Sequence, residues 1–354
     1  MSSFFSLKVI ELVQETKDCV SVSFEIPSSL KDRFLFLAGQ YLTLKLSIDG
    51  EEVRRSYSIC SSPEDNTKIT VAVKRVKGGK ASNFINEKIK IGDVLEVMSP
   101  MGNFHSAMHA SNRKKYYLFA GGSGITPMMS IIKSVLHFEK DSSLVLFYGN
   151  ENEEAIIFND QLNEIEKSAD GRLKVFNILN HPQNEIKSEM VGIMDVMKNK
   201  ELIASYVDLK SDNEYFICGP VGMMDIVVSA LKDASATQSR VHVEYFTAPV
   251  SEDKSDSGEG VNARLTIICD GDKRVIDLKS AETVLDAALA AGIDAPYACQ
   301  GGSCCTCRAK LLSGKVHMKV NYALLDSEVK EGFILTCQAV ALSNELVVDY
   351  DKGR

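Results

Sequence analysis

The sequence contains no apolar run close to the ~20 residues that a membrane-spanning helix needs. It also has no excess of basic residues, because 48 aspartates and glutamates outnumber 40 lysines and arginines and leave a net charge of −8. A general nucleic-acid-binding protein needs a basic face for the phosphates, so this charge argues against that class. The first residues lack a basic region followed by an apolar core, and we therefore expect no secretory signal and a cytoplasmic protein.

The cysteines do not follow the pattern of a disulfide framework. There are nine of them, an odd number, in a chain of 354 residues, whereas disulfide-stapled scaffolds are short and secreted and have an even cysteine count. Five of the nine fall between residues 299 and 337. This clustering is the first indication of chemistry in the chain.

The hydrophobic pattern of residues 1–110 predicts an antiparallel β-barrel. Short alternating runs are typical of barrel strands, and they occur at residues 20–24, 41–46 and 69–73. One helix interrupts the strands, and we expect Ser82 to cap it over residues 83–88.

The pattern changes in residues 111–248, which predict an α/β domain. Continuous apolar runs that alternate with helices indicate a parallel sheet with helices on both faces. The expected strands lie at residues 116–120, 144–148, 173–178, 215–218 and 241–245, and the expected helices at residues 126–139 and 153–167.

Residues 249–262 predict a flexible acidic linker, because residues 251–260 contain nothing that could join a core. Residues 263–354 then begin with a hairpin around Asp270–Asp272 and continue with a helix over residues 282–291. The chain is therefore expected to hold three domains.

The third region carries the strongest motif in the sequence. Cys299, Cys304 and Cys307 have the C-x4-C-x2-C spacing of plant-type [2Fe–2S] proteins. The fourth ligand of such clusters comes from a remote strand, and Cys337 is the candidate. The glycines at residues 301–302 let the loop fold over a cluster and aim backbone N–H groups at its sulfurs.

A structural zinc site is the alternative for these cysteines. Zinc sites usually show paired C-x2-C knuckles, and here only one such pair is present, after a glycine-rich loop. Cys305 lies inside the motif but off the ligand spacing, and we expect it to be a small residue packed beside the cluster.

Residues Arg55–Ser58, on a predicted barrel strand, are chemically suited to a flavin. Strand alternation places Arg55 and Tyr57 on one face, where the arginine can neutralise a phosphate while the tyrosine stacks on an aromatic ring. Ser58 could reach the N5 edge of that ring. An exposed Arg–Tyr pair is the alternative, but the glycines at residues 78–79 precede a helix N-terminus, a ready site for pyrophosphate, and favour the flavin.

Two turns in the second region indicate a dinucleotide. Gly121–Pro127 joins the first strand to the first helix, where glycines let a pyrophosphate approach the helix end. This turn is not the G-x-G-x-x-G fingerprint, and a purely structural turn is the alternative. Cys218–Pro220 ends a later strand, where ligands of α/β proteins bind. Its cysteine could pack against a nicotinamide, or it could be a buried, inert thiol.

These motifs, in this order, resemble the ferredoxin–NADP reductase family, in the branch with a C-terminal plant-type ferredoxin domain. The resemblance covers all three regions and implies a flavin barrel, a nicotinamide-binding α/β domain and a β-grasp ferredoxin-like domain. It implies FAD held by Arg55, Tyr57, Ser58, Val73, Lys74, Arg75, Gly79, Ala81 and Ser82. It implies NADH or NADPH held by Gly122, Ser123, Gly124, Thr126, Cys218, Gly219 and Pro220.

The resemblance also implies catalytic roles for Ser58, Cys218, Glu244 and Phe246. Glu244 and Phe246 match the family's Glu-x-Phe at the end of the α/β domain, and Phe246 would shield the flavin ring where nicotinamide docks. The metal ligands would be Cys299, Cys304, Cys307 and Cys337.

Finer features are most similar to the reductase subunits of phenylacetyl-CoA epoxidases, although reductases of steroid ring hydroxylases share many of them. These features lie at Arg54–Cys60, Pro296–Gly302 and Asn321–Leu324. The resemblance implies an enzyme that passes electrons from NAD(P)H through FAD and the cluster to a partner oxygenase. The partner expected is the phenylacetyl-CoA ring 1,2-epoxidase of aerobic phenylacetate degradation. The alternatives are a reductase of a Rieske oxygenase or steroid hydroxylase, and a non-catalytic redox sensor on the same folds.

The coenzyme expected is NADH, by a narrow margin over NADPH. Residues after the second strand of such a domain approach the adenosine ribose, and selectivity for NADP needs a cation there. This chain has Glu151 where the similar epoxidase reductases tend to have arginine. Arg172 or Lys174 could still supply the charge from elsewhere.

Overall fold

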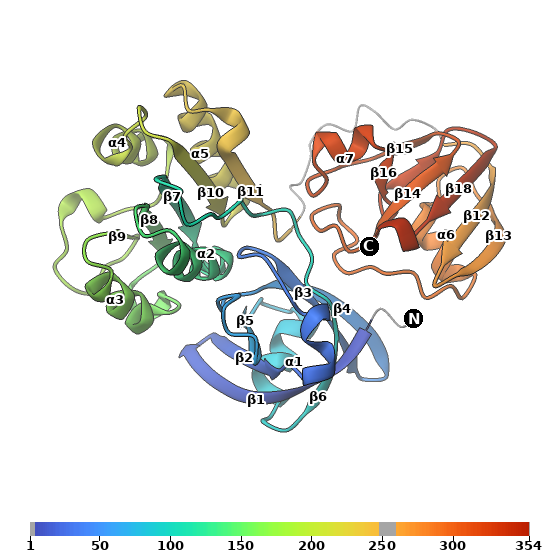
Figure 1. Ribbon diagram of the computed structural model, residues 1–354, viewed down its shortest axis with the longest axis horizontal. Helices are drawn as coiled ribbons and strands as arrows, with labels where there is room; N and C mark the ends of the chain where they lie inside the picture. The colour runs from blue at the N-terminus through green and yellow to red at the C-terminus, as the bar shows by residue number, and fades with distance from the viewer. Residues whose placement is uncertain (1–3, 248–259, 354) are drawn as a thin grey trace.

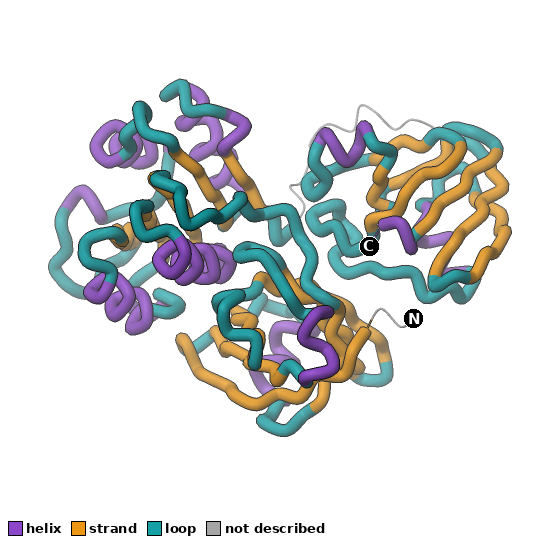
Figure 2. The backbone as a smooth tube through the Cα atoms, viewed as in Figure 1, coloured by secondary structure: helices purple, strands orange, loops and turns teal. Residues whose placement is uncertain are grey.

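The computed structural model describes residues 4–247 and 260–353, and Figure 1 shows them as three lobes in chain order. Of the predicted linker 249–262, residues 249–259 lie outside the described residues. Strands dominate the first and third lobes, whereas helices flank the sheet of the second (Figure 2). Among the described helices, none combines the length and the apolar character of a bilayer-spanning segment.

Six antiparallel strands form the first lobe in the order β4-β3-β6-β1-β2-β5. A bridge between Ile59, just after β4, and Val71 on β5 joins the two edges, so the sheet closes as a barrel. Alternate residues of β3, namely Leu42, Leu44 and Leu46, are buried in the barrel core. The strands are Phe4–Thr16 (β1), Cys19–Glu25 (β2), Tyr41–Ile48 (β3), Glu51–Ser58 (β4), Lys68–Lys74 (β5) and Val94–Met98 (β6).

The helix of the barrel, α1 (Lys80–Lys88), begins earlier than the sequence predicts. Gly79 is its N-cap residue, and Ser82 lies within the first turn. The Ser82 hydroxyl accepts the backbone N–H of Val76 at 3.1 Å and thereby fixes the loop before the helix. The predicted capping role of Ser82 is therefore wrong, because this side chain serves the loop instead of the helix end.

Five parallel strands form the sheet of the second lobe in the order β11-β10-β7-β8-β9. The chain enters at β7, adds β8 and β9 on one side, and then adds β10 and β11 on the other. The reversal between β7 and β10 is the kind of switch point at which α/β domains bind ligands. Helices α2 and α3 cover one face and α4 and α5 the other. The elements are Lys115–Gly121 (β7), Ile125–Phe138 (α2), Ser143–Asn150 (β8), Asn159–Ser168 (α3), Leu173–Leu179 (β9), Val196–Tyr206 (α4), Asn213–Cys218 (β10), Val221–Asp233 (α5) and Val241–Glu244 (β11).

The helix predicted over residues 153–167 is interrupted at Phe158. This residue has a φ of +63°, so the α-helix starts only at Asn159, after a short 3-10 turn at Glu153–Ala155. Ile157 and Phe158 are buried in the core on the α2 side of the sheet. Their burial breaks the helix that their sequence pattern allows.

The third lobe is a five-stranded sheet in the order β13-β12-β18-β14-β16. In the predicted hairpin, Asp270 (φ +53°) and Gly271 (φ +82°) adopt the left-handed conformation that a two-residue turn requires. Thr283 caps α6, which therefore begins two residues after the predicted start. The elements are Ala263–Cys269 (β12), Asp272–Leu278 (β13), Val284–Ala290 (α6), Arg308–Ser313 (β14), Val316–Met318 (β15), Asp326–Lys330 (α7), Phe333–Leu335 (β16), Ala339–Ala341 (β17) and Glu345–Asp349 (β18).

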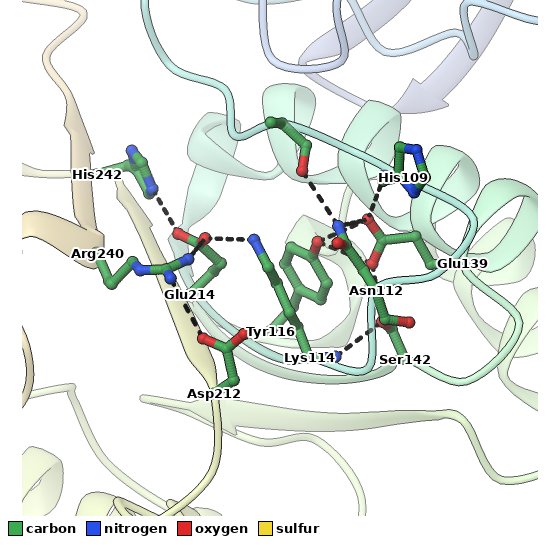
Figure 3. A network of polar contacts seen from close by, with 11 residues as sticks. His109, Asn112, Lys114, Tyr116, Glu139, Ser142, Asp212, Glu214, Arg240 and His242 are labelled. Carbon is green, nitrogen blue, oxygen red and sulfur yellow. Dashed lines mark hydrogen bonds and ion pairs between the residues drawn. The ribbon is translucent and has the colours of Figure 1, made fainter.

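Two buried carboxylates anchor the chain segment that joins the first two lobes (Figure 3). The first is Glu139, after α2, which accepts hydrogen bonds from Tyr116 Oη at 2.9 Å, Ser142 Oγ at 2.8 Å and Asn112 Nδ2 at 2.6 Å. The connecting segment is thus tied through Asn112 to the α2 side of the sheet.

The second carboxylate is Glu214, at the start of β10. It accepts hydrogen bonds from Lys114 Nζ and His242 Nε2, both at 2.8 Å, and pairs with Arg240. Burial alone would raise the pKa of Glu214, but the hydrogen bonds from His242, Lys114 and Arg240 lower it to about 2. The charge network therefore persists at neutral pH and fixes the end of the segment on the sheet.

Candidate flavin, nicotinamide and iron–sulfur sites

A cleft of about 480 Å³ lies where the barrel, the α/β domain and the third lobe meet. The following predicted flavin residues line this cleft: Arg55, Tyr57, Ser58, Lys74, Gly79, Ala81 and Ser82. We call it the flavin cleft. Within the described residues no carboxylate pairs with Arg55, whose Nη1 donates to the backbone oxygen of Arg54 at 2.7 Å, so its charge is available to a phosphate.

Val73 and Arg75 do not line the flavin cleft. Successive side chains of a strand point to opposite faces. Ala72, Lys74 and Val76 accordingly face the cleft, whereas Val73 is fully buried in the barrel core and Arg75 pairs with Glu87 at 2.5 Å. Of residues 73–75, only Lys74 therefore lines the flavin cleft, and a role of Val73 and Arg75 in binding FAD stays a prediction that their side chains do not support.

Ser58 and Glu244 connect the barrel to the α/β domain at the cleft. Ser58 Oγ donates to Glu244 Oε2 at 3.0 Å. Phe246 lies two residues further on, lines the same cleft and remains 41% exposed. Three of the four predicted catalytic residues therefore meet in one cleft. Burial raises the pKa of Glu244 to about 8, although the bond from Ser58 opposes this shift.

The Glu244→Gln variant should test this burial. Because the pKa of the folded-state carboxyl is raised above its ordinary value, the protonated form stabilises the fold, and that stability is lost as the pH rises through about 8. Between pH 6 and pH 9 the Tm of the native protein should fall relative to that of Glu244→Gln by at least about 2 °C. A Tm difference that does not change with pH would show that Glu244 ionises freely in the cleft.

The dinucleotide turn lies at the switch point of the sheet. A Cβ on Gly124 would stand 2.0 Å from the backbone oxygen of Cys218, and one on Gly121 would stand 2.6 Å from Pro220 Cδ. The two turns that the sequence singled out therefore pack together, and only glycine fits at these points. Thr126 Oγ1 donates to the backbone oxygen of Ser123 at 3.0 Å and fixes the start of α2.

Cys218 is fully buried, and its side chain is part of the core on the α2 side of the sheet. Burial raises the pKa of this thiol well above its usual range, so the thiol is neutral. Cys218 and Gly219 position the turn around Gly121, and Pro220 borders a second cleft of about 450 Å³. We call this the nucleotide cleft.

The nucleotide cleft extends over the carboxyl ends of β7 and β8. It is lined by Gly122 and by Gly149–Glu151, as the sequence predicts, and also by Ile193–Asp195. The last three residues belong to a loop without a motif, so sequence reasoning missed them. Lys74 lines both clefts and is therefore placed between the flavin and the dinucleotide turn.

The four predicted cluster ligands come together in the third lobe. Cys299 lies beside Cys304 and Cys307 lies beside Cys337, and the two pairs are close enough for Cys299 and Cys337 to interact electrostatically. None of the four forms a disulfide. The backbone N–H of Gly301 donates to Cys299 Sγ at 3.4 Å, and a thiolate that binds a cluster is stabilised by such a hydrogen-bond donor.

The loop geometry also fits a cluster. Gly302 has a φ of +74°, and a Cβ there would meet Val320 Cγ2 at 2.9 Å. Within the described residues, no three histidine, cysteine or acidic side chains converge as a single metal ion requires. Four cysteines are the ligand number of a plant-type [2Fe–2S] cluster.

The cluster loop forms one wall of the flavin cleft. Cys299, Gly301, Ser303 and Cys304 line that cleft together with Tyr41 of the barrel. Sequence reasoning missed this contact, because it joins residues about 250 positions apart. The donor and acceptor sites therefore share a boundary, with no other domain between them.

Known families and proteins match all three lobes. Residues 6–106 match the oxidoreductase FAD-binding domain, residues 118–229 the oxidoreductase NAD-binding domain, and residues 267–342 the 2Fe-2S iron-sulfur cluster binding domain. One subunit of the 1,2-phenylacetyl-CoA epoxidase of Escherichia coli (strain K12) is 40% identical over 354 residues, covering 99% of both chains. The ferredoxin reductase component of the 3-ketosteroid-9-alpha-monooxygenase of Mycobacterium tuberculosis (strain ATCC 25618 / H37Rv) is 34% identical, covering 98% of this chain and 96% of that protein.

Among solved structures, phthalate dioxygenase reductase superposes with a TM-score of 0.60 at 24% identity, over 98% of each chain. This likeness confirms the predicted fold class. A flavin barrel, a nicotinamide-binding α/β domain and a plant-type ferredoxin domain in one chain define an NAD(P)H-dependent flavin and iron–sulfur oxidoreductase. The chain belongs to the family of reductase components that supply electrons to oxygenases, the family that its motifs predict.

Proposed function

We propose that this chain delivers electrons from NADH to the oxygenase component of a phenylacetyl-CoA epoxidase. The proposed electron route from flavin to cluster rests on one observation, namely that the cluster loop forms one wall of the flavin cleft. The acceptor is proposed from the 40% identity to a subunit of that epoxidase, over 99% of both chains.

The residues of this chain take the following roles in the proposal. Arg55 and the turn at Gly79 bind the FAD phosphates, Tyr57 covers the flavin ring, and Ser58 with Glu244 positions its reactive edge. Phe246 would cover the face of the flavin ring on which nicotinamide docks. When bound, the flavin supplies the conversion between the two-electron chemistry of nicotinamide and the one-electron chemistry of an iron–sulfur cluster. Cys299, Cys304, Cys307 and Cys337 hold the cluster at the cleft wall.

Reconstitution with purified partners tests the acceptor. The protein should support NADH-dependent consumption of phenylacetyl-CoA when it is combined with the oxygenase subunits of the epoxidase. It should support steroid hydroxylation poorly when combined with the oxygenase of the ketosteroid system, the second candidate favoured by the 34% identity. The reverse ranking would assign the chain to the steroid class. If neither oxygenase accepts electrons although NADH reduces an artificial acceptor, the acceptor proposal fails.

The charge of the nucleotide cleft supports NADH. Glu151 lines the cleft, and its carboxylate accepts a hydrogen bond from Asn180 Nδ2 at 3.2 Å. Arg172 is unavailable for a 2′-phosphate, because its guanidinium donates to the backbone oxygens of Leu136 and Glu139 at 2.9 and 3.2 Å. Lys174 lies near the start of β9, at the opposite end of the strand from the cleft.

Glu151→Arg should change the coenzyme preference. An arginine at this position would bring a charge-assisted partner to the 2′-phosphate, so kcat/KM for NADPH should rise roughly tenfold relative to NADH. Glu154→Arg is the matched control, because Glu154 is exposed and does not line the cleft. A native preference for NADPH that Glu151→Arg leaves unchanged would place the 2′-phosphate elsewhere.

We also propose a cytoplasmic location. Four cysteines outside the ligand set, namely Cys19, Cys60, Cys218 and Cys305, are buried thiols that form no disulfide. Free thiols in this number fit a reducing compartment.

A further inference from the structure

The barrel holds the third lobe through a buried arginine. Arg54, on β4, is only 3% exposed. Its Nη2 donates to Asp294 Oδ1 at 2.6 Å and its Nη1 to the backbone oxygen of Ala295 at 3.2 Å, both in the third lobe. The guanidinium also lies 4.4 Å from the ring centroid of Tyr297. A planar group with several donors can make these contacts together, which a lysine cannot do.

Arg54 therefore holds the chain just before the cluster loop. Asp294–Tyr297 ends two residues before the first ligand, Cys299. On the barrel side, Glu52 Oε1 accepts the Arg54 Nε–H at 2.7 Å and fixes the side chain toward the third lobe.

A tyrosine holds the other end of the same loop. Tyr41, on β3, is buried in the core of the third lobe, although it belongs to the barrel. Its hydroxyl accepts the backbone N–H of Cys305 at 3.0 Å and lies 3.1 Å from Thr306 Oγ1. Thr306 Oγ1 in turn lies 3.2 Å from Thr43 Oγ1 of the barrel. Cys305 and Thr306 stand between the ligands Cys304 and Cys307.

Two further contacts lie beyond the loop. Asn103, after the last barrel strand, donates to the backbone oxygen of Ala323 at 3.1 Å and to Glu328 Oε2 at 2.6 Å. The rings of Tyr245 and Tyr322 lie 5.1 Å apart, which connects the α/β domain to the third lobe. The cluster loop is thus held on both sides by residues of the barrel, of which Tyr41 lines the flavin cleft and Arg54 does not.

We propose that Arg54 and Tyr41 are positioning residues that seat the ferredoxin domain so that its cluster loop forms the wall of the flavin cleft. They would act on electron transfer from the flavin to the cluster, which must occur twice for each hydride, because a hydride carries two electrons and a [2Fe–2S] cluster accepts one at a time. Hydride transfer from nicotinamide to the flavin is a separate step that does not involve Arg54. This inference rests on the proposed flavin and cluster sites.

Anaerobic stopped-flow reduction by NADH separates the two steps, because bleaching of the flavin and reduction of the cluster have different absorbance spectra. Arg54→Met keeps an apolar side chain beside Tyr297 but removes the donors, and Tyr41→Phe removes only the hydroxyl. Each variant should slow cluster reduction roughly tenfold, because Arg54→Met leaves the buried backbone oxygen of Ala295 without its donor and Tyr41→Phe leaves the buried N–H of Cys305 without its acceptor. In Arg54→Met the rate of flavin bleaching should not change. Small-angle scattering should show a larger radius of gyration for Arg54→Met.

Asp294→Asn changes the third-lobe partner of Arg54 and leaves the barrel unaltered. If Arg54→Met loses its flavin, the rate of cluster reduction in Asp294→Asn therefore tests the positioning role. Glu345→Gln, which removes an exposed carboxylate of the same domain on β18, is the matched control and should behave as the native protein. The inference is overturned if Asp294→Asn and Tyr41→Phe, with full flavin and iron content, reduce their clusters at the native rate. Failure of the native protein itself to show flavin or cluster absorbance would contradict the proposed sites instead.

Discussion

Cys337→Ser is expected to remove the iron–sulfur cluster and to lower electron delivery to an oxygenase more than roughly 100-fold, since even the partners of metal ligands cost 10–100-fold when they are lost. Cys337 lies beside Cys307, and its Sγ accepts a hydrogen bond from Gln338 Nε2 at 3.6 Å. These two contacts fix the position of the Cys337 sulfur next to the other predicted ligands. A serine hydroxyl is a poorer ligand for iron in a sulfur-rich cluster. The iron content of the purified variant and its NADH-driven reduction of an oxygenase are the measurements.

The step before the cluster should remain intact in this variant. Neither Cys337 nor its neighbour Gln338 lines the flavin cleft, so NADH should still bleach the flavin. Cys305→Ser is the matched control, because Cys305 lies outside the ligand spacing and faces Tyr41 at 3.3 Å. It should retain its iron. An iron-free Cys305→Ser protein, or a Cys337→Ser protein with a full cluster, would overturn the ligand assignment.

Tyr57→Ala and Arg55→Ala should release FAD. The first removes an aromatic ring that lines the flavin cleft, and the second removes the cleft guanidinium that we propose binds the FAD phosphates. A charge-assisted hydrogen bond contributes about 1.5–3 kcal/mol, so the Kd for FAD should rise roughly 10- to 100-fold in Arg55→Ala. Equilibrium dialysis followed by flavin absorbance gives the Kd directly.

Arg75→Ala is the control for this prediction. Arg75 follows strand β5 of the same barrel, carries the same charge, and pairs with Glu87 away from the cleft. It should bind FAD as the native protein does. If Arg75→Ala loses FAD while Arg55→Ala retains it, the FAD phosphates bind beside Arg75 and outside the flavin cleft, which would contradict this assignment.

The sequence predicts the three folds well because each depends on a local pattern. The alternation in residues 41–46 and the continuous apolar run at residues 116–120 identify their strands directly. The helix at residues 153–167 is mispredicted because burial of Phe158 in the core outweighs the local pattern. A resemblance that names residues 73–75 together also takes no account of side-chain direction, and only Lys74 of the three lines the cleft.

The contacts between the domains could not be predicted. Arg54 and Asp294 are 240 residues apart in the chain, although a hydrogen bond joins them. In the sequence, Arg54 is the first residue of the Arg54–Cys60 feature and Tyr41 is a residue of a predicted barrel strand, and neither pattern indicates a contact with another domain. Only the folded chain shows that both contact the third lobe. The proximity of the four cysteines, by contrast, could be predicted, because three of them lie within nine residues of one another.

Anaerobic titration with NADH, followed by visible absorbance and electron paramagnetic resonance, tests the electron route from nicotinamide to the cysteine loop. We expect that the native protein contains FAD and iron, that NADH bleaches the flavin, and that a paramagnetic signal of a reduced [2Fe–2S] cluster then grows toward one spin per chain. A protein whose flavin is bleached by NADH while no cluster signal develops would contradict the route from the flavin cleft to the cysteine loop.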